Sequence, residues 1–119
     1  MFLVEEKAVE CQIAVMLRLI GVQPDVRGWR YIVDAVQMVV KDEGLLCAIT
    51  KELYPAIARK NGTTATRVER CIRSAIETAW KEGDAEEQQH YFGSIVGPEK
   101  GKPTNGAVIG GLSQWVRLA

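Results

Sequence analysis

Apolar residues recur three and four positions apart along nearly the whole chain, and this spacing limits the possible folds more than any other feature. The spacing is typical of helices that bury one face, whereas the alternating pattern of half-buried strands is nearly absent. A first helix is expected over about residues 4 to 20, and Gly21 stands where a left-handed cap would end it. Its buried stripe is Val9, Ile13, Met16, Leu17 and Ile20.

A second apolar stripe follows the turn VQPD, after Asp25 as a candidate N-cap. Many residues of this stripe are β-branched and would also suit a strand, but their spacing fits a period of 3.6 better than alternation. We therefore expect a helix that ends near residues 42 to 44. Its stripe is Trp29, Ile32, Val33, Val36, Val39 and Val40.

The rest of the chain contains further helical segments separated by turns. After the connector LLCAI comes KELYPAIARKNG, in which Pro55 marks a helix start or a kink. A short acidic helix is expected around residues 84 to 91, followed by the apolar stretch FGSIV and the loop GPEKGKPTNG. Thr104 or Asn105 would cap a last helix. We predict one all-α domain over residues 1 to 119, with about six helices. The last helix is expected to be buried through Val108, Leu112, Trp115 and Val116.

Composition argues against several classes of function. Lys and Arg number 15, as do Asp and Glu, so the net charge alone points neither to nucleic acid nor to a membrane. The opening 21 residues are interrupted by charges, which predicts neither a signal peptide nor a membrane span. No phosphate-binding loop or Ser/His/Asp set is present, so no enzyme is expected.

The cysteines and the histidine do not have the spacing of a metal site. Cys11, Cys47 and Cys71 are far apart in apolar surroundings, and His90 is the only histidine. We expect buried free thiols in a reducing cytoplasm, without a metal ion or another cofactor.

Basic residues gather between residues 51 and 81. This stretch has seven basic and three acidic residues, a local net charge of +4. An acidic run follows it directly, from Glu82 to Glu87. The neutral total therefore conceals a polarised surface.

Residues 63 to 80 form a strongly amphipathic pattern. Thr63 or Thr64 could cap this helix, and Thr66 with Glu69 also fits a capping box one turn later. The polar half admits two interpretations. It is an ordinary solvated face, in which Arg73 pairs with Glu77 four residues on, or it is a surface that binds a polyanion.

The preceding segment favours the second interpretation. A helix-turn-helix needs a small residue at the helix crossing, a residue that tolerates a left-handed turn, and an apolar anchor in the second helix. Ala58, Gly62 and Val68 occupy these places. We therefore predict a helix-turn-helix over about residues 50 to 81, with its second helix in the major groove of DNA.

The side chains of this second helix suit the reading of base pairs. Arginine can bond guanine O6 and N7 in a bidentate fork, and glutamate can accept a hydrogen bond from cytosine N4. The predicted base-reading residues are Thr66, Arg67, Glu69, Arg70, Arg73 and Ser74. The predicted phosphate contacts are Lys51, Arg59, Lys60, Thr64 and Lys102, although a solvated role suits each lysine equally well.

A known family carries the same residues. The segment ITKELYPAIARKNGTTATRVERCIRSAIETAWKEG and the later KPTN resemble the C-terminal DNA-binding domain of the sporulation master response regulator of endospore-forming bacteria. The likeness spans nearly the whole chain, is densest from residue 49 to 83, and includes the specific pattern TxxRVERxIRxAIExAW. The resemblance implies a cytoplasmic six-helix domain that binds short G·C-containing promoter boxes and activates or represses transcription.

The resemblance also implies roles for particular residues. The positions of Arg67, Glu69, Arg70 and Arg73 would face DNA, and Lys102 would lie near the backbone. Residues 86 to 96 would contact the sigma subunit of RNA polymerase.

The chain differs from the full-length protein of this family in having no receiver-domain pattern, and Ser74 replaces a larger polar residue. That protein acts as a homodimer on tandem sites, and Trp115 and Arg117 are candidates for the contact here, with core packing as the other interpretation of Trp115. A helical protein-interaction module that sequesters sigma subunit or a homologous regulator is the alternative function.

Overall fold

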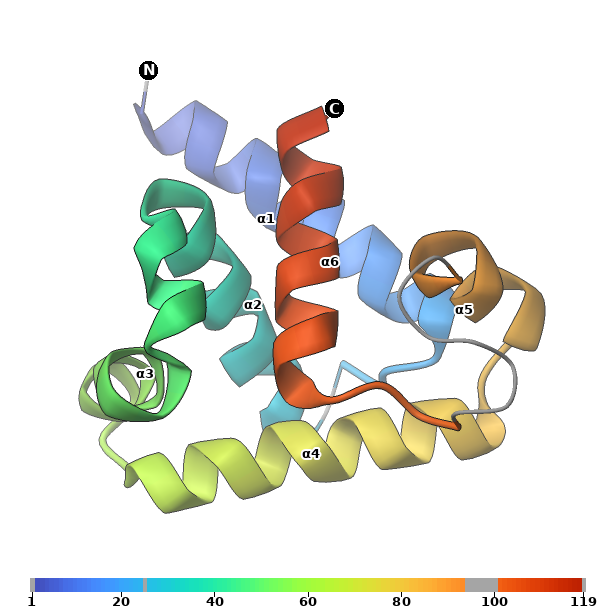
Figure 1. Cartoon of the computed structure of the whole chain (residues 1–119). Coiled ribbons are helices and arrows are strands. Elements are labelled where there is room, and N and C mark those ends of the chain that lie inside the picture. The colour runs from blue at the N-terminus through green and yellow to red at the C-terminus, as the bar shows by residue number, and fades with distance from the viewer. Residues whose placement is uncertain (1, 25, 94–100, 119) are drawn as a thin grey trace.

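The computed structural model describes residues 2–24, 26–93 and 101–118, and these residues form helices and no strands (Figure 1). The predicted all-α class is therefore confirmed. The α-helices of the described part are α1 (Phe2–Ile20), α2 (Arg27–Lys41), α3 (Tyr54–Asn61), α4 (Ala65–Glu82), α5 (Ala85–Phe92) and α6 (Asn105–Leu118). Between α2 and α3 lie a 3₁₀ turn, η1 (Glu43–Cys47), and a π-helical turn, η2 (Ile49–Leu53).

Helix α2 is the centre of the fold. It packs against α1, α4 and α6, and one of its faces is fully buried, as a 3.6-residue period of apolar residues requires. In Figure 1, α4 runs along the base of the molecule, and the N-terminal end of α1 lies at the opposite side of the view. Helix α2, whose β-branched residues would also have suited a strand, is thus a helix as its spacing predicted. Its most deeply buried apolar residues are Ile32, Val33, Ala35, Val36 and Val39.

Helix ends follow local rules at most of the predicted places. Gly21 has φ +105°, and the N–H of Val22 donates to the carbonyl of Leu17 at 2.9 Å, as in a left-handed C-terminal cap. Thr104 Oγ1 accepts from the N–H of Ala107 at 3.1 Å, so Thr104 caps α6. At the start of α2 the N-cap residue is Val26, without a side-chain cap.

Some predictions fall outside the described residues. Asp25, the candidate cap, lies there, as do residues 94–100, which hold most of the predicted FGSIV stretch and the start of the following loop. No described helix is long and apolar enough to cross a membrane.

The expectation of buried cysteines is wrong. Cys11 and Cys47 are exposed and Cys71 is partly exposed, and all three are free thiols. Cys11 precedes the buried Ile13 by two positions, which in a helix places it on nearly the opposite side. Cys47 is the last residue of η1, and the backbone of the following residue is no longer helical.

Candidate nucleic-acid interface

The turn between α3 and α4 has the geometry that its sequence predicts. Gly62 adopts φ +64° and ψ +38°, in the left-handed region that glycine tolerates best. Ala58 and Val68 are 4% and 0% exposed, so both sides of the turn are anchored in the core. Pro55 stands in the first turn of α3, directly after the π-helical turn η2, and it therefore marks the start of the α-helical segment.

Thr64 is the N-cap of α4. Its Oγ1 accepts from the N–H of Arg67 at 3.2 Å, which satisfies one of the donors left unpaired at a helix start. Thr66 lies inside the helix, so the alternative capping box with Glu69 is not formed. The arginines of α4 thus begin within the first turn of a well-defined helix.

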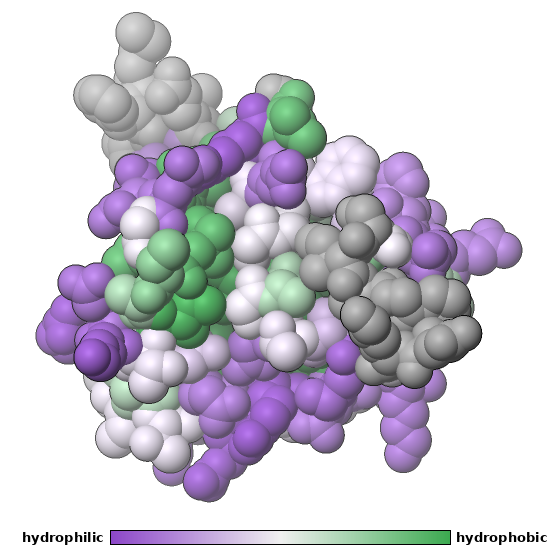
Figure 2. Space-filling view, in the orientation of Figure 1, coloured by the Kyte–Doolittle hydropathy of each residue, from purple (hydrophilic) through white to green (hydrophobic). Residues whose placement is uncertain are grey.

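Helix α4 is divided into a buried face and a polar exposed face, as the pattern indicated. In Figure 2 the surface along α4 at the base of the molecule is largely hydrophilic. Of the six predicted base-reading residues, five are exposed and Glu69 is partly buried. The exposed five are Thr66, Arg67, Arg70, Arg73 and Ser74. The buried face consists of Val68, Ile72, Ala75, Ile76 and Ala79.

Glu69 is held by neighbours on both sides. Its Oε2 lies 3.7 Å from Nε of Arg73, which pairs with Glu69 and not with Glu77, the partner considered from the sequence. Asn105 Nδ2 lies 3.5 Å from the same oxygen and also donates to the Glu69 carbonyl at 3.2 Å and to the Tyr54 hydroxyl at 3.1 Å. Asn105 therefore links α6 to α3 and α4, a role that its position as a candidate cap did not reveal.

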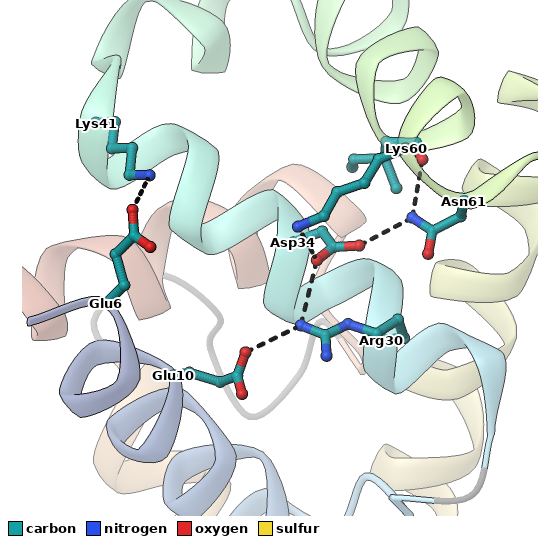
Figure 3. Close-up of polar contacts among 8 residues, drawn as sticks. Glu6, Glu10, Arg30, Asp34, Lys41, Lys60 and Asn61 are labelled. Atoms are coloured by element: carbon teal, nitrogen blue, oxygen red, sulfur yellow. Dashed lines mark hydrogen bonds and ion pairs between the residues drawn. The ribbon is translucent and has the colours of Figure 1, made fainter. Parts of the chain in front are cut away.

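The predicted phosphate-contact residues are all exposed, but they come from separate elements. Lys51 lies in η2, Arg59 and Lys60 in the last turns of α3, and Lys102 before α6. Lys60 is already engaged, because its Nζ donates to Oδ1 of the buried Asp34 at 3.0 Å (Figure 3).

A polar hollow of about 370 Å³ lies where α2 meets the α3–α4 turn. Its three arginines come from two different helices, and the lining of the hollow includes Arg27, Arg30, Tyr31, Asn61, Thr63 and Arg67. Reasoning from the sequence did not single out Arg27 and Arg30, since they lie more than 30 residues before the turn. The available signal was a pair of arginines three residues apart in the first turn of an amphipathic helix.

The fold and this surface define an all-α domain that exposes a basic helix face behind a tight turn. The chain belongs to the family described as the sporulation initiation factor Spo0A C-terminal domain, whose model matches residues 13–116. This family is a DNA-binding regulatory domain and not a known enzyme family. Sporulation-related DNA binding and transcription regulation follow from the membership.

Proposed function

We propose that the domain reads short G·C-containing promoter boxes through a helix-turn-helix formed by α3 and α4. The observation that carries the proposal is the exposed face of α4, which begins at a capped turn and presents Arg67, Arg70 and Arg73 to solvent. A recognition helix contacts base edges with its N-terminal residues. Bound at a promoter, such a domain would activate or repress transcription in the cytoplasm.

Arg70 is the best candidate for a guanine contact. Among the described residues it has no ion-pair partner, so its guanidinium can form a bidentate fork without first breaking a bond. Glu69 is positioned by Arg73 and Asn105 and would accept from a cytosine amino group. Thr66, Arg67, Arg73 and Ser74 complete the proposed base-reading set.

The residues proposed to contact phosphates differ in whether their side chains already have a partner within the chain. The Thr64 oxygen accepts from a backbone N–H, and its hydroxyl proton stays available for a phosphate oxygen. Lys51, Arg59 and Lys102 are exposed. Lys60 would have to exchange Asp34 for a phosphate, so we expect it to contribute least of these residues.

Selection of bound sequences from random duplexes tests the proposal. We expect recovery of one short G·C-containing box, with an affinity that falls steeply as salt is raised because phosphate binding releases counterions. A recovered pool without a shared box would contradict base reading by α4. An affinity that does not change with salt concentration would contradict the phosphate contacts.

We also propose cooperative binding to two boxes about one helical turn apart. The candidate contact residues are engaged within the chain: Trp115 Nε1 donates to the Tyr91 carbonyl at 3.2 Å, and Arg117 donates to the Val39 carbonyl at 2.9 Å. Leu118, which follows Arg117, is 75% exposed and is therefore a better candidate for a homodimer contact. Gel shifts on duplexes with one box, two boxes, and two boxes moved by half a turn should show tighter binding only for the in-phase pair.

A second candidate function is binding of another protein. An apolar hollow of about 440 Å³ lies among α1, α5 and α6, lined in part by Val15, Met16, Tyr91 and Trp115. Val15 is 57% exposed there, and α5 carries part of the segment proposed to contact the sigma subunit. If purified sigma subunit binds the domain and Val15→Asp abolishes that binding, while no duplex is retained, this second function is the correct one.

A further inference from the structure

Helix α2 meets α4 at an unusually close crossing. A Cβ atom on Gly28 would lie 2.5 Å from the carbonyl oxygen of Cys71 and 2.6 Å from Cβ of Ala75, so no larger residue fits without movement of the backbone. The first turn of α2 therefore rests directly on α4. This crossing sets the neighbouring Arg27 beside the exposed face of the proposed recognition helix.

Arg27 borders α4 on two sides. It lines the polar hollow at the α3–α4 turn together with Thr63 and Arg67. It also lines a second, mainly apolar hollow of about 370 Å³ that includes Ser74 and Thr78 of α4. Arg27 therefore stands next to both the start and the middle of the helix.

The charges at the polar hollow are only partly compensated. Arg30 is neutralised by Glu10 and Asp34, with N–O distances of 3.3 and 3.2 Å (Figure 3). Arg27 and Arg67 have no ion-pair partner among the described residues, and no acidic side chain lines the hollow. Two guanidinium groups that border one hollow repel each other, and an anion placed between them removes the repulsion.

We propose that Arg27 binds a backbone phosphate of duplex DNA in this hollow, beside the contacts made by α4. Tyr31 and Thr63 line the same hollow, and their hydroxyl groups would donate to the remaining phosphate oxygens. Helix α2 thus becomes part of the DNA-binding surface and sets the register of α4 on the duplex. The inference rests on the proposed DNA-reading function.

The test measures duplex affinity against KCl concentration for the parent, Arg27→Gln and Arg27→Lys, on the selected box and on a random duplex. Lys7→Gln is the matched control, because it removes one exposed positive charge from the N-terminal part of α1, far from α4 in Figure 1. Arg27→Gln should weaken binding to both duplexes by the same factor, roughly fivefold to tenfold near 0.1 M salt. It should also lower the slope of log K against log salt by about one. Arg27→Lys should keep the slope, and Lys7→Gln should match the parent.

The outcomes distinguish failure of the Arg27 phosphate contact from failure of the proposed DNA-reading function. If the parent binds its box and Arg27→Gln behaves like Lys7→Gln, the phosphate contact is wrong while DNA reading stands. If the parent binds no duplex, the proposed function fails and this inference fails with it. If inorganic phosphate stabilises the parent but not Arg27→Gln, and both bind DNA equally, the hollow holds free phosphate and the DNA assignment is overturned.

Discussion

The Nζ atom of Lys60 lies 3.0 Å from Oδ1 of Asp34, whose side chain has no exposed surface (Figure 3). Arg30 approaches the same oxygen at 3.2 Å, and Asn61 Nδ2 donates to the other carboxylate oxygen at 2.9 Å. Asp34 belongs to the central helix α2, whereas Lys60 and Asn61 end α3. One buried carboxylate therefore ties the α3–α4 turn to the middle of the fold.

Replacing this carboxylate should destabilise the domain. Asp34→Ala removes hydrogen bonds from Lys60 and Asn61 and an ion pair with Arg30, and we expect the free energy of unfolding to fall by about 2 kcal/mol. The loss is limited because Lys60 and Arg30 are about half exposed and regain water. Urea unfolding measures it, with exposed Glu82→Ala as the control. Equal midpoints for the two variants would contradict a structural role of Asp34.

The two threonines at the start of α4 should behave differently. Thr64→Ala removes the cap bond to the N–H of Arg67 and should cost about 1 kcal/mol of unfolding free energy. Thr66→Ala lies inside the helix, where alanine is the better helix former, and should leave stability unchanged or slightly raised. Thermal or urea unfolding distinguishes them, and an equal loss in both variants would place the cap elsewhere.

The buried side chain of Gln88 bonds carbonyl groups in the last turns of α1 and α4. Its Nε2 donates to the carbonyls of Ile20 at 2.9 Å and Ala79 at 2.7 Å. Gln88→Ala should lower the free energy of unfolding by about 2 kcal/mol, since buried acceptors lose a donor.

The variant Gln88→Glu adds a pH dependence to this loss. Its carboxylate would face two carbonyl oxygens, so the folded state should raise the pKa of that group above the unfolded value of about 4.3. Stability relative to Gln88→Ala should therefore be greatest below about pH 4 and fall as pH rises. Unfolding measured from pH 4 to 7 tests this expectation, and parallel profiles of the two variants would rule it out.

Tyr54 should contribute to loss of stability at alkaline pH. Burial raises the pKa of its hydroxyl above the ordinary 10.0, although the hydrogen bond from Asn105 opposes the shift. Since the folded pKa is the higher one, this contribution is complete below about pH 10 and is lost as pH rises further. Tyr54→Phe should flatten that decline and cost about 1 kcal/mol at neutral pH. An unchanged alkaline decline in the variant would assign the loss to other groups.

Arg70 and Glu69 should affect DNA binding in different ways. Arg70→Ala should cost about 1 to 3 kcal/mol of specific binding and relax the preference at one base pair, as the loss of a bidentate guanine contact does. Glu69→Ala should change selectivity more than affinity, because it removes an acceptor and also a repulsion with phosphate. Binding to duplexes with single base-pair changes measures both effects. Unchanged preferences in both variants would show that another surface reads the sequence.

Much of the fold and part of the candidate site follow from the sequence because their causes are local. The 3.6-residue spacing identifies the buried faces of α1, α2, α4 and α6. Gly62 fits a left-handed turn and Pro55 a helix start for reasons that lie within a few residues of each. The exposed arginines of α4 could be predicted in the same way, since helical spacing alone separates them from the buried face.

Other features depend on contacts between distant segments, and only the tertiary structure decided them. Arg27 lies beside α4 because Gly28 permits a close crossing at Cys71 and Ala75, which follow it by more than 40 residues. Lys60 is bound by Asp34, and Arg73 pairs with Glu69 at a place that Asn105 of α6 also contacts. Spacing along a chain determines which face of a helix is apolar, but which charges meet across helices depends on how those faces pack together.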